Sequence, residues 1–492
     1  MRGRRRVRGP SARPGYDLAV RSAVLAVWRR CCAVPVLEQD ALLYLASALF
    51  ALCTAFVAIS ADYRQWGQMA AVAYVAGAAI CLAVSRRARR RGIAAERIGW
   101  TRRLVVLVLV VGAVLLPLFA QLTWRAEARP GAHAQPEVAV VERAGDRAVH
   151  AQDPYLRNPR SVGVPPSSDS PSVDQSSFFP YLPGMVPFGL LNAVGGPPEL
   201  RDARVALGGF TLVVGAIALL ASDATLGRRG RALQFLVVLP SGALPMVTGG
   251  DDLPVLALML LGLVLAQRRR AVLAGLAMGC AGTLKFTAWP LLLLLLLSVR
   301  DREGNRAPLR YGLAVLIIVV PVIGAGIVLD PSAFFENVVR FPLGLARVKS
   351  PAASPLLGQV LVTVFPRDKT LITALLVLVG VAIVIVALVR HPPRTVAGAA
   401  RFTAFAMLVA TVLAPATRFG YLIYPANLFV WAYVLDGMRP AGAAAVSDED
   451  QLASSISNTV RTSELVGAVS LPPPSAGVMD GFTGSMVTPS SQ

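Results

Sequence analysis

Long apolar runs separated by short arginine clusters are the feature of this chain that most limits its fold. The 492 residues are 55% hydrophobic and only 15% charged. A soluble domain cannot bury that much apolar surface, whereas a lipid bilayer can accommodate it. The sequence therefore predicts an all-α polytopic membrane protein.

The arginine clusters give the predicted membrane helices a direction. Clusters at 2–9, 86–92, 227–231 and 268–270 lie beside or between apolar runs. Such clusters are typical of the cytoplasmic ends of membrane helices. The formal net charge of +20 is thus spread over helix ends. No basic soluble domain is present that would indicate nucleic-acid binding.

Orienting the apolar runs by these clusters predicts about 12 transmembrane helices with both termini in the cytoplasm. The predicted spans are 41–60, 68–85, 104–122, 203–222, 233–247, 253–267, a two-armed hairpin over 271–299, 311–329, 371–389, 398–415 and 420–436. Residues 124–202 and 330–369 then form external loops, in which amphipathic helices are expected to lie at the membrane interface. Residues 1–40 are predicted to be a basic cytoplasmic segment. Residues 440–492, rich in Ser, Ala, Gly and Pro, are predicted to be a disordered cytoplasmic tail.

The hairpin over 271–299 is inferred from the lysine in its middle. A single span would bury the ammonium of Lys285 and would place the arginines at 268–270 and at 300–302 on opposite sides. A hairpin with Lys285 at its outer apex keeps both arginine clusters inside. Each arm is then shorter than the roughly 20 residues that a full span needs.

This threading brings most of the other charged side chains to the external face. They are Glu137, Glu142, Asp146, Asp153, Asp251, Asp252, Lys285, Glu336, Arg340, Arg347, Lys349 and Arg418. Contact with water explains a charge at any one of these positions. The pair Asp251 and Asp252 raises a further question, because it opens an apolar helix, where a buried charge is costly.

Five blocks of the sequence follow one another in an order found in a known group of membrane enzymes. They are the stretch from Glu137 through Asp153-Pro154-Tyr155, FFPYLPGMVPF at 178–188, the block from GGDD at 249–252 to Lys285 and Pro290, SPAASPLLGQ at 350–359, and LAPATRFGYLIYP at 413–425. The pattern resembles the GT-C glycosyltransferases that use polyprenyl-phosphate sugars. It is most similar to family 87, the polyprenol-phosphate-mannose-dependent α-mannosyltransferases of actinobacteria.

The resemblance covers residues 104–436 and implies a GT-C membrane domain there, with the hairpin at 41–85 as an N-terminal addition. It implies an integral plasma-membrane enzyme whose active site faces away from the cytoplasm. Such an enzyme moves a sugar, with mannose as the first expectation, from a polyprenyl-phosphate donor to a glycan or glycolipid of the cell envelope. Membrane lipid, donor and acceptor are the expected partners.

The resemblance also implies roles for acidic residues. Transfer with inversion needs a carboxylate that takes the proton of the attacking hydroxyl. Glu137 is the first candidate because it follows an outward span and opens an amphipathic segment. The family usually has aspartate at this position, so Asp153 and Glu142 are rival bases. Tyr155, in the DPY element, is expected to contact substrate.

Cationic residues are expected to hold the donor phosphate. Lys285 and Arg418 are the first candidates because both interrupt apolar runs near the external interface, where an unpaired cation is costly. Arg347 and Lys349, in the second loop, are the second choice. Asp251 and Asp252 are expected to bind sugar hydroxyls. Related enzymes generally use such donors without metal, so no metal and no other cofactor is expected.

Other functions remain open from the sequence. The transferred sugar could be arabinofuranose or another hexose, and the acceptor a glycolipid, a lipoglycan, an arabinogalactan or a protein. A flippase or transporter should show internal repeats and ionisable groups near mid-membrane, and neither is evident. A non-catalytic membrane assembly factor is a further alternative, because Glu137 stands where the family usually has aspartate and the catalytic acid could have been lost.

Overall fold

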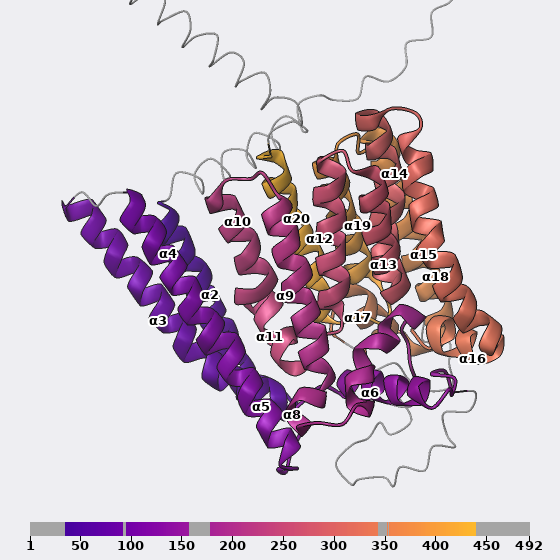
Figure 1. Ribbon diagram of the computed structural model, residues 1–492, viewed down its shortest axis with the longest axis horizontal. Helices are drawn as coiled ribbons and strands as arrows, with labels where there is room; N and C mark the ends of the chain where they lie inside the picture. The colour runs from indigo at the N-terminus through magenta and orange to yellow at the C-terminus, as the bar shows by residue number, and fades with distance from the viewer. Residues whose placement is uncertain (1–34, 92–94, 157–177, 343–351, 353, 439–492) are drawn as a thin grey trace, which may run out of the picture. The chain divides into compact units, whose positions relative to one another are not determined.

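The computed structural model describes most of the chain between residues 35 and 438 (Figure 1). The described stretches are 35–91, 95–156, 178–342, residue 352 and 354–438. All of the described residues belong to one compact unit, Met1–Met438. The tail predicted at 440–492, and nearly all of the basic segment predicted at 1–40, lie outside the described residues.

All regular structure in the described stretches is helical. Among the described residues, eight helices are long and apolar enough to cross a membrane, as expected for a polytopic membrane protein. Three further apolar helices have fewer than 18 residues: Asp252–Gln267, Ala271–Leu284 and Phe286–Arg300. The predicted total of about 12 spans depends on these shorter helices and stays a prediction.

Three helical segments at the N-terminal side of the unit pack together (Figure 1). They are α2 (Val36–Val57), α3 (Ala61–Arg91) and a continuous run of α4 (Ala95–Leu109), η1 (Val110–Leu115) and α5 (Leu116–Ala126). The predicted spans at 41–60, 68–85 and 104–122 lie largely within these helices. Helix α3 extends through its arginine cluster, because arginine is a good helix former once it is outside lipid.

A proline accounts for one bond between these segments. Pro117 has no N–H to donate to the carbonyl of Ala113, four residues earlier. The indole N–H of Trp66 in α3 donates to that carbonyl at 3.0 Å. The distortion at η1, which is a π-helix, is therefore tied to the packing of α3 against the third segment.

A buried ion-pair network joins these segments to the main bundle. The Asp40 carboxylate of α2 is only 1% exposed. It receives Nε of Arg102 at 2.6 Å and Nη1 of Arg231 at 2.8 Å. Gln234 donates to the same carboxylate at 3.2 Å and to the Tyr44 hydroxyl at 2.7 Å. Since Arg231 and Gln234 belong to the main bundle, the N-terminal hairpin is attached to it through charges.

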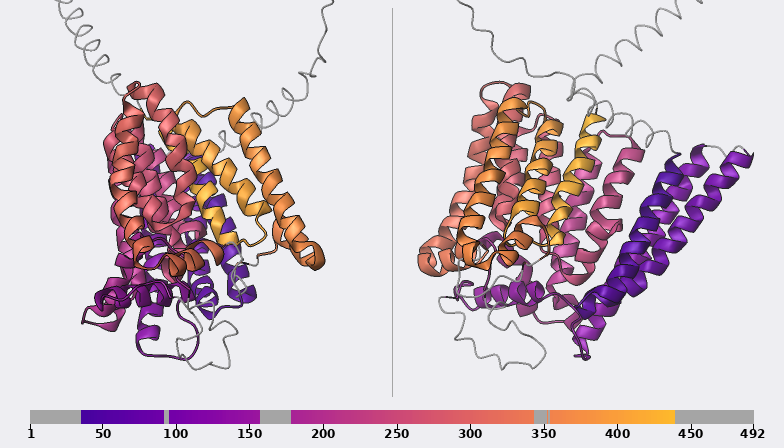
Figure 2. Two further views of the ribbon diagram at one scale, coloured as in Figure 1. Left: turned by 90° about the vertical axis from the view of Figure 1, so that its right-hand side faces the viewer. Right: turned by 180° about the vertical axis from the view of Figure 1, so that it is seen from behind.

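The main bundle is built from the following helices. They are α9 (Ala203–Ala221), α10 (Leu226–Leu233), η5 (Gln234–Val238), α11 (Pro240–Thr248), α12 (Asp252–Gln267), α13 (Ala271–Leu284), η6 (Phe286–Ala288), α14 (Trp289–Glu303), α15 (Ala307–Leu329), α18 (Lys369–Arg390), α19 (Val396–Leu413), η9 (Phe419–Leu422) and α20 (Ile423–Asp436). Most residues of α12 are buried, and its neighbours include α9, α13, α19 and α20. Figure 2 shows α18 on the outside of the bundle.

Two of the sequence expectations for this bundle can be compared with the structure. Helix α13 ends at Leu284 and α14 begins at Trp289, so the run at 271–299 is a hairpin broken at Lys285, as predicted. The run at 420–436 is not one helix, because η9 is a 3-10 helix that precedes α20. Pro425 then falls in the first turn of α20, where its missing N–H has no helical partner to lose.

Short helices fill the two loops that the sequence placed outside. The first loop holds α6 (Pro136–Val149), η4 (Pro183–Gly189), α7 (Leu190–Ala193) and α8 (Pro198–Arg201), and the second holds α16 (Pro331–Phe335), η7 (Glu336–Arg340), α17 (Leu357–Val364) and η8 (Pro366–Asp368). The short helices labelled in Figure 1, among them α6, α8 and α16, lie toward its lower end. The arginine-rich helix ends at 86–91, 227–231 and 268–270 lie at the opposite end. Which side of a membrane each end faces stays a prediction.

Candidate functional site

The start of α6 is bonded to the end of α11. The backbone N–H of Gln135 donates to the carbonyl of Thr248 at 2.9 Å, and the Gln135 side chain donates to the Thr248 hydroxyl at 2.9 Å. Pro136 occupies the first helical position, where a missing N–H costs nothing. Glu137 follows in the first turn, where the helix dipole favours a carboxylate. Glu137 is thereby held beside the turn that carries Asp251 and Asp252.

The turn after α11 requires glycine. Gly249 has φ +112° in the left-handed region, and its N–H closes α11 on the carbonyl of Pro245 at 2.8 Å. A Cβ on Gly249 would lie 2.1 Å from Cγ2 of Val138. Only glycine allows both this backbone conformation and the contact with α6. The turn places Asp251 and Asp252 at the start of α12, where the helix dipole stabilises negative charge.

Lys285 binds both of these carboxylates. Its Nζ is 2.8 Å from Oδ1 of Asp251 and 2.7 Å from Oδ1 of Asp252. The side chains of Lys285, Asp251 and Asp252 are 13%, 8% and 16% exposed. Burial acts to lower the pKa of Lys285, but the two carboxylates raise it above its ordinary value. Lys285 is therefore an ammonium held between two acids at the break between α13 and α14.

Aromatic side chains enclose this ion pair. The Lys285 ammonium lies 4.9 Å from the ring centroid of Tyr181, within the range of a cation–π contact. The Tyr424 hydroxyl donates to Asp252 at 2.7 Å and accepts from the Thr287 hydroxyl at 2.8 Å. Tyr181 is 6% exposed and Tyr424 is fully buried. The acids and the lysine therefore have a rigid apolar and hydrogen-bonded wall on one side.

Arg418 reaches Glu137 from the other end of the chain. The Nη1 atom of Arg418 is hydrogen bonded to Oε1 of Glu137. Burial acts to lower the pKa of Arg418, but the Glu137 carboxylate raises it above its ordinary value. The backbone around Arg418 is fixed by the second loop, since Phe419 N–H donates to the Ser354 hydroxyl at 3.1 Å. Glu137 and Arg418 remain 18% and 35% exposed, so the pair is reachable.

The two ion pairs belong to one site. Burial raises the pKa of Tyr181 well above its ordinary value, and the carboxylates of Asp251 and Glu137 raise it further. The two bonds between Gln135 and Thr248 hold the start of α6, with Glu137, against the turn that carries Asp251 and Asp252. We call the five ionisable groups around Tyr181 the polar cluster: Glu137, Asp251, Asp252, Lys285 and Arg418. It combines three carboxylates with two cations, all only partly accessible.

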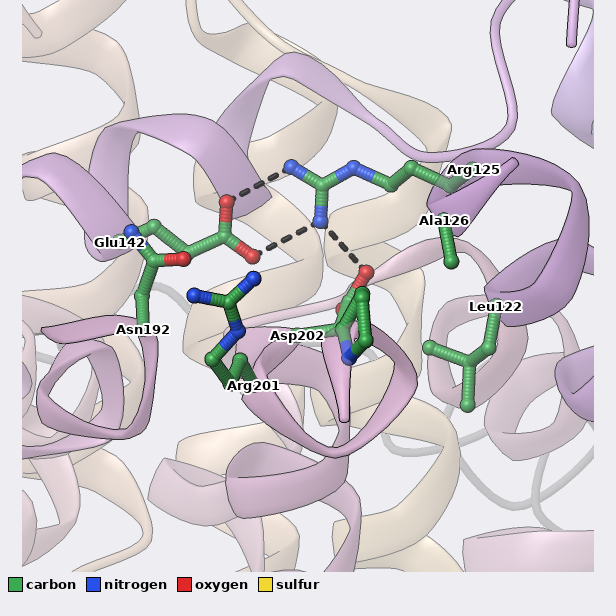
Figure 3. Close-up of a pocket in the computed structure, with 8 residues that line it drawn as sticks. Leu122, Arg125, Ala126, Glu142, Asn192, Arg201 and Asp202 are labelled. Carbon is green, nitrogen blue, oxygen red and sulfur yellow. Dashed lines mark hydrogen bonds and ion pairs between the residues drawn. The ribbon is translucent and has the colours of Figure 1, made fainter. Parts of the chain in front are cut away.

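The rival acid Glu142 lies on α6, about 1.4 turns after Glu137, and is not part of the polar cluster. It forms a two-pronged ion pair with Arg125, at 2.8 and 2.6 Å (Figure 3). The backbone N–H of Ala203 donates to Glu142 at 3.1 Å. Arg125 also binds Asp202 at 2.5 Å. Both oxygens of Glu142 are thus engaged within the protein.

The rival acid Asp153 and the neighbouring Tyr155 do not belong to the polar cluster. The Asp153 side chain accepts the N–H of Tyr155 at 2.9 Å, and burial raises the pKa of Asp153 above its ordinary value. Tyr155 is 2% exposed, and its hydroxyl donates to the carbonyl of Tyr181 at 2.9 Å. Tyr155 therefore fixes the backbone at Tyr181, and the substrate contact expected of Tyr155 stays a prediction.

The remaining candidates cannot be placed. Arg347 and Lys349 lie outside the described residues. Within the described part of the chain, no three His, Cys, Asp or Glu side chains are grouped so that they could share a metal ion. Asp251 and Asp252 instead share Lys285.

Sequence reasoning did not single out the tyrosines of the site. Tyr181 lies in the aromatic and proline-rich stretch at 178–188, and Tyr424 lies in the last helix pair. Both stretches were noted for their composition, but nothing in a single sequence marks which tyrosine faces a cluster. One sequence signal does point to Tyr181 and Tyr424: each places a hydroxyl in an otherwise apolar run, and a buried hydroxyl needs a hydrogen-bond partner.

Comparison with known proteins adds a family match. Residues 180–415 match the model of glycosyltransferase family 87, which indicates a membrane glycosyltransferase. Asp251, Asp252 and Lys285 fall within the matched residues, whereas Glu137 precedes them and Arg418 follows them. No curated protein and no solved structure matches the chain.

Proposed function

We propose that this glycosyltransferase moves a sugar from a polyprenyl-phosphate donor to a hydroxyl of a cell-envelope glycan or glycolipid, with mannose as the first candidate sugar. The observation that carries the proposal is the polar cluster. It unites a carboxylate at the head of α6 with two cations from breaks between membrane helices. Transfer from a lipid phosphate needs these two kinds of group side by side.

Glu137 is the proposed general base. The acceptor hydroxyl attacks the anomeric carbon, the bond from that carbon to the donor phosphate breaks, and Glu137 takes the hydroxyl proton. The leaving group is the polyprenyl phosphate, and the configuration at the anomeric carbon inverts. Glu142 is the less suitable acid, because Arg125 and the Ala203 N–H already occupy its oxygens.

Arg418 and Lys285 are the proposed phosphate ligands. In the structure both are paired with carboxylates, so a bound donor has to compete for them. A phosphate that draws Arg418 away from Glu137 frees Glu137 to accept a proton, so donor binding and base activation are coupled. Arg offers a planar fork to phosphate and Lys a compact charge. Arg347 and Lys349 are the second-choice ligands.

Asp251 and Asp252 are proposed to position the sugar. Carboxylates accept hydrogen bonds from hydroxyls, and a donor phosphate that binds Lys285 frees an oxygen on each acid. The turn that carries them packs against α6 at Val138 through Gly249, which keeps them close to Glu137. We propose that no metal takes part, because cations of the chain supply the charge at the phosphate.

We propose that the enzyme has a GT-C fold in the plasma membrane, with both termini cytoplasmic and the polar cluster outside. Support comes from the two ends of the unit. The helix ends rich in arginine, at 86–91, 227–231 and 268–270, lie opposite the end that holds the cluster. Clusters of arginine favour the cytoplasmic side.

The deciding experiment is transfer by the purified protein in liposomes, with polyprenyl-phosphate mannose as donor. Glu137→Gln keeps the size and hydrogen bonding of the side chain but removes its basicity. We expect it to slow transfer by about 100-fold to 10,000-fold while donor binding is retained. Glu127→Gln is the matched control, because Glu127 lies in the same loop and pairs with the exposed Arg129.

Two results would count against the proposal. Wild-type transfer by Glu137→Gln would remove Glu137 from the mechanism. Transfer from polyprenyl-phosphate arabinofuranose but not from the mannose donor would show that mannose is the wrong sugar, while the proposed roles of the site residues would stand.

A further inference from the structure

A pocket of about 270 Å³ opens on the side of α6 that carries Glu142 (Figure 3). It is lined by residues of α5, of α6 and of the segment from α8 into α9, among them Leu122, Arg125, Ala126, Glu142, Arg201 and Asp202. None of these residues belongs to the polar cluster. The pocket therefore calls for its own explanation.

The acids of this pocket are already saturated. Arg125 binds both Glu142 and Asp202, and Arg204 binds Asp202 at 2.8 Å. The Asp202 side chain also caps α9 by accepting the Arg204 N–H at 3.0 Å. Glu142 is 7% exposed and Asp202 is 5% exposed. Such buried, fully bonded carboxylates have little capacity left for another cation.

Arg201 takes no part in this ion-pair network. Two arginines line the pocket. Arg125 is bonded to both carboxylates, Glu142 and Asp202, whereas Arg201 is bonded to neither. Arg201 makes no hydrogen bond or ion pair with any described residue, and its Nε is buried without a partner. Figure 3 shows its guanidinium among the pocket residues. Arg201 as a whole is half-buried. A shielded N–H without a hydrogen-bond partner is costly, and an anionic ligand would accept its hydrogen bond.

An apolar stripe that begins at the last residue of η1 and continues along α5 leads into the pocket, and we call it the α5 stripe. Leu115, Phe119, Leu122 and Ala126 are spaced by four, three and four residues, which places them on one face of the helix. Leu115 is 48% exposed and Phe119 is 65% exposed. Both belong to a helical run that is long and apolar enough to cross a membrane, so these side chains can contact lipid. The stripe therefore offers apolar surface that ends at a free guanidinium.

We propose that this pocket binds the anionic phosphate head group of a phospholipid whose acyl chain lies along the α5 stripe. Arg201 donates to the phosphate, and Leu115, Phe119 and Leu122 contact the chain. The site is separate from the donor phosphate site on Lys285 and Arg418, and it does not depend on the proposed transfer reaction. The lipid is either a constituent of the bilayer or an acceptor that carries the same phosphate chemistry.

The test uses the full chain in detergent micelles, with thermal unfolding followed as lipid is added. Dioleoylphosphatidylglycerol should raise the Tm of the wild type in a saturable manner, because a ligand of the folded state stabilises it. Dioleoylglycerol, which lacks the phosphate, should not. Arg201→Gln should weaken the apparent affinity for phosphatidylglycerol by about tenfold or more, the loss expected for one charge-assisted hydrogen bond.

Two variants serve as controls. Arg129→Gln removes a cation in the loop just after α5, but Arg129 is exposed and pairs with Glu127 at 2.6 Å, so affinity should be unchanged. Arg201→Lys keeps the charge and should recover part of the affinity. If Arg201→Gln is too unstable to purify, Arg201→Lys with a weakened but saturable response still tests the site.

Three results would overturn the proposal. Equal phosphatidylglycerol affinity in the wild type and Arg201→Gln would show that Arg201 only completes the ion-pair network. A response to inorganic phosphate as strong as to phosphatidylglycerol would show that the acyl chain contributes nothing. A Tm response to dioleoylglycerol equal to the response to phosphatidylglycerol would show that the phosphate is not recognised.

Measurements of KM identify the source of the lipid. A raised KM for the acceptor alone in Arg201→Gln assigns the pocket to the acceptor, and unchanged KM values assign it to bilayer lipid.

Discussion

Removal of the Lys285 ammonium is the most informative perturbation of the polar cluster. Lys285→Met keeps the length and apolar stem of the side chain but leaves Asp251 and Asp252 without their cation. These carboxylates are 8% and 16% exposed. Removal of one partner from a buried ion pair costs about 3 to 5 kcal/mol. We expect Lys285→Met to lower the free energy of unfolding by an amount in that range.

The pH dependence gives this prediction a sign. Burial raises the pKa of Asp251, and the Lys285 ammonium opposes the increase, so the variant should raise that pKa further. A carboxyl whose folded pKa is raised contributes stability below its unfolded pKa of about 3.9 and loses it as the pH rises through the folded pKa. The stability deficit of Lys285→Met should therefore be largest near neutral pH and should shrink as the pH falls toward 4.

The assay is thermal and denaturant unfolding in detergent micelles between pH 4 and 8. The triple variant with Asp251→Asn and Asp252→Asn should regain most of the stability, because no uncompensated charge remains. Lys369→Met is the matched control, since Lys369 is exposed at the start of α18. A deficit that does not change with pH, or no recovery in the triple variant, would refute the charge argument and leave packing as the cause.

Three further predictions follow from other parts of the structure. Gly249→Ala should lower the Tm, because its Cβ would lie 2.1 Å from Val138 and its backbone has φ +112°. Adding Val138→Ala should relieve the clash but not the backbone strain, so thermal unfolding of the double variant should show only partial recovery. Asp40→Ala should cost about 3 kcal/mol or more by leaving Arg102 and Arg231 unpaired in a buried site, measurable as a lower Tm. Cysteines placed at the exposed positions 127 and 150 of the first loop should react with a membrane-impermeant thiol reagent added outside cells, and reaction from the cytoplasmic side alone would reverse the threading.

The polar cluster shows how far the sequence could go. Lys285 was identified as a hairpin apex because a cation in the middle of an apolar run needs a break, and the structure has the break at that residue. The partner of Lys285 could not be predicted, since Asp251 and Asp252 are more than 30 positions away. Arg418 and Glu137 are further apart still, and their pairing depends on how the second loop holds residue 419.

The same limit explains why three acids looked alike in the sequence. Glu137, Glu142 and Asp153 all lie in one polar loop, and charge on a loop predicts only contact with water. The structure separates them by partners. Glu137 faces Arg418, Glu142 is enclosed by Arg125 and Ala203, and Asp153 caps the backbone at Tyr155.

Hydropathy and the placement of arginine are properties of each segment separately, so the amino-acid sequence is enough to identify a helical membrane protein. Which charges meet follows only from the packed bundle, because ion pairs form between segments that are far apart in the chain. Lys285 between two aspartates, Arg418 on Glu137 and the unpaired Arg201 are all products of that assembly. Electrostatic energy depends on distance in space and on burial, and neither is encoded in spacing along the chain.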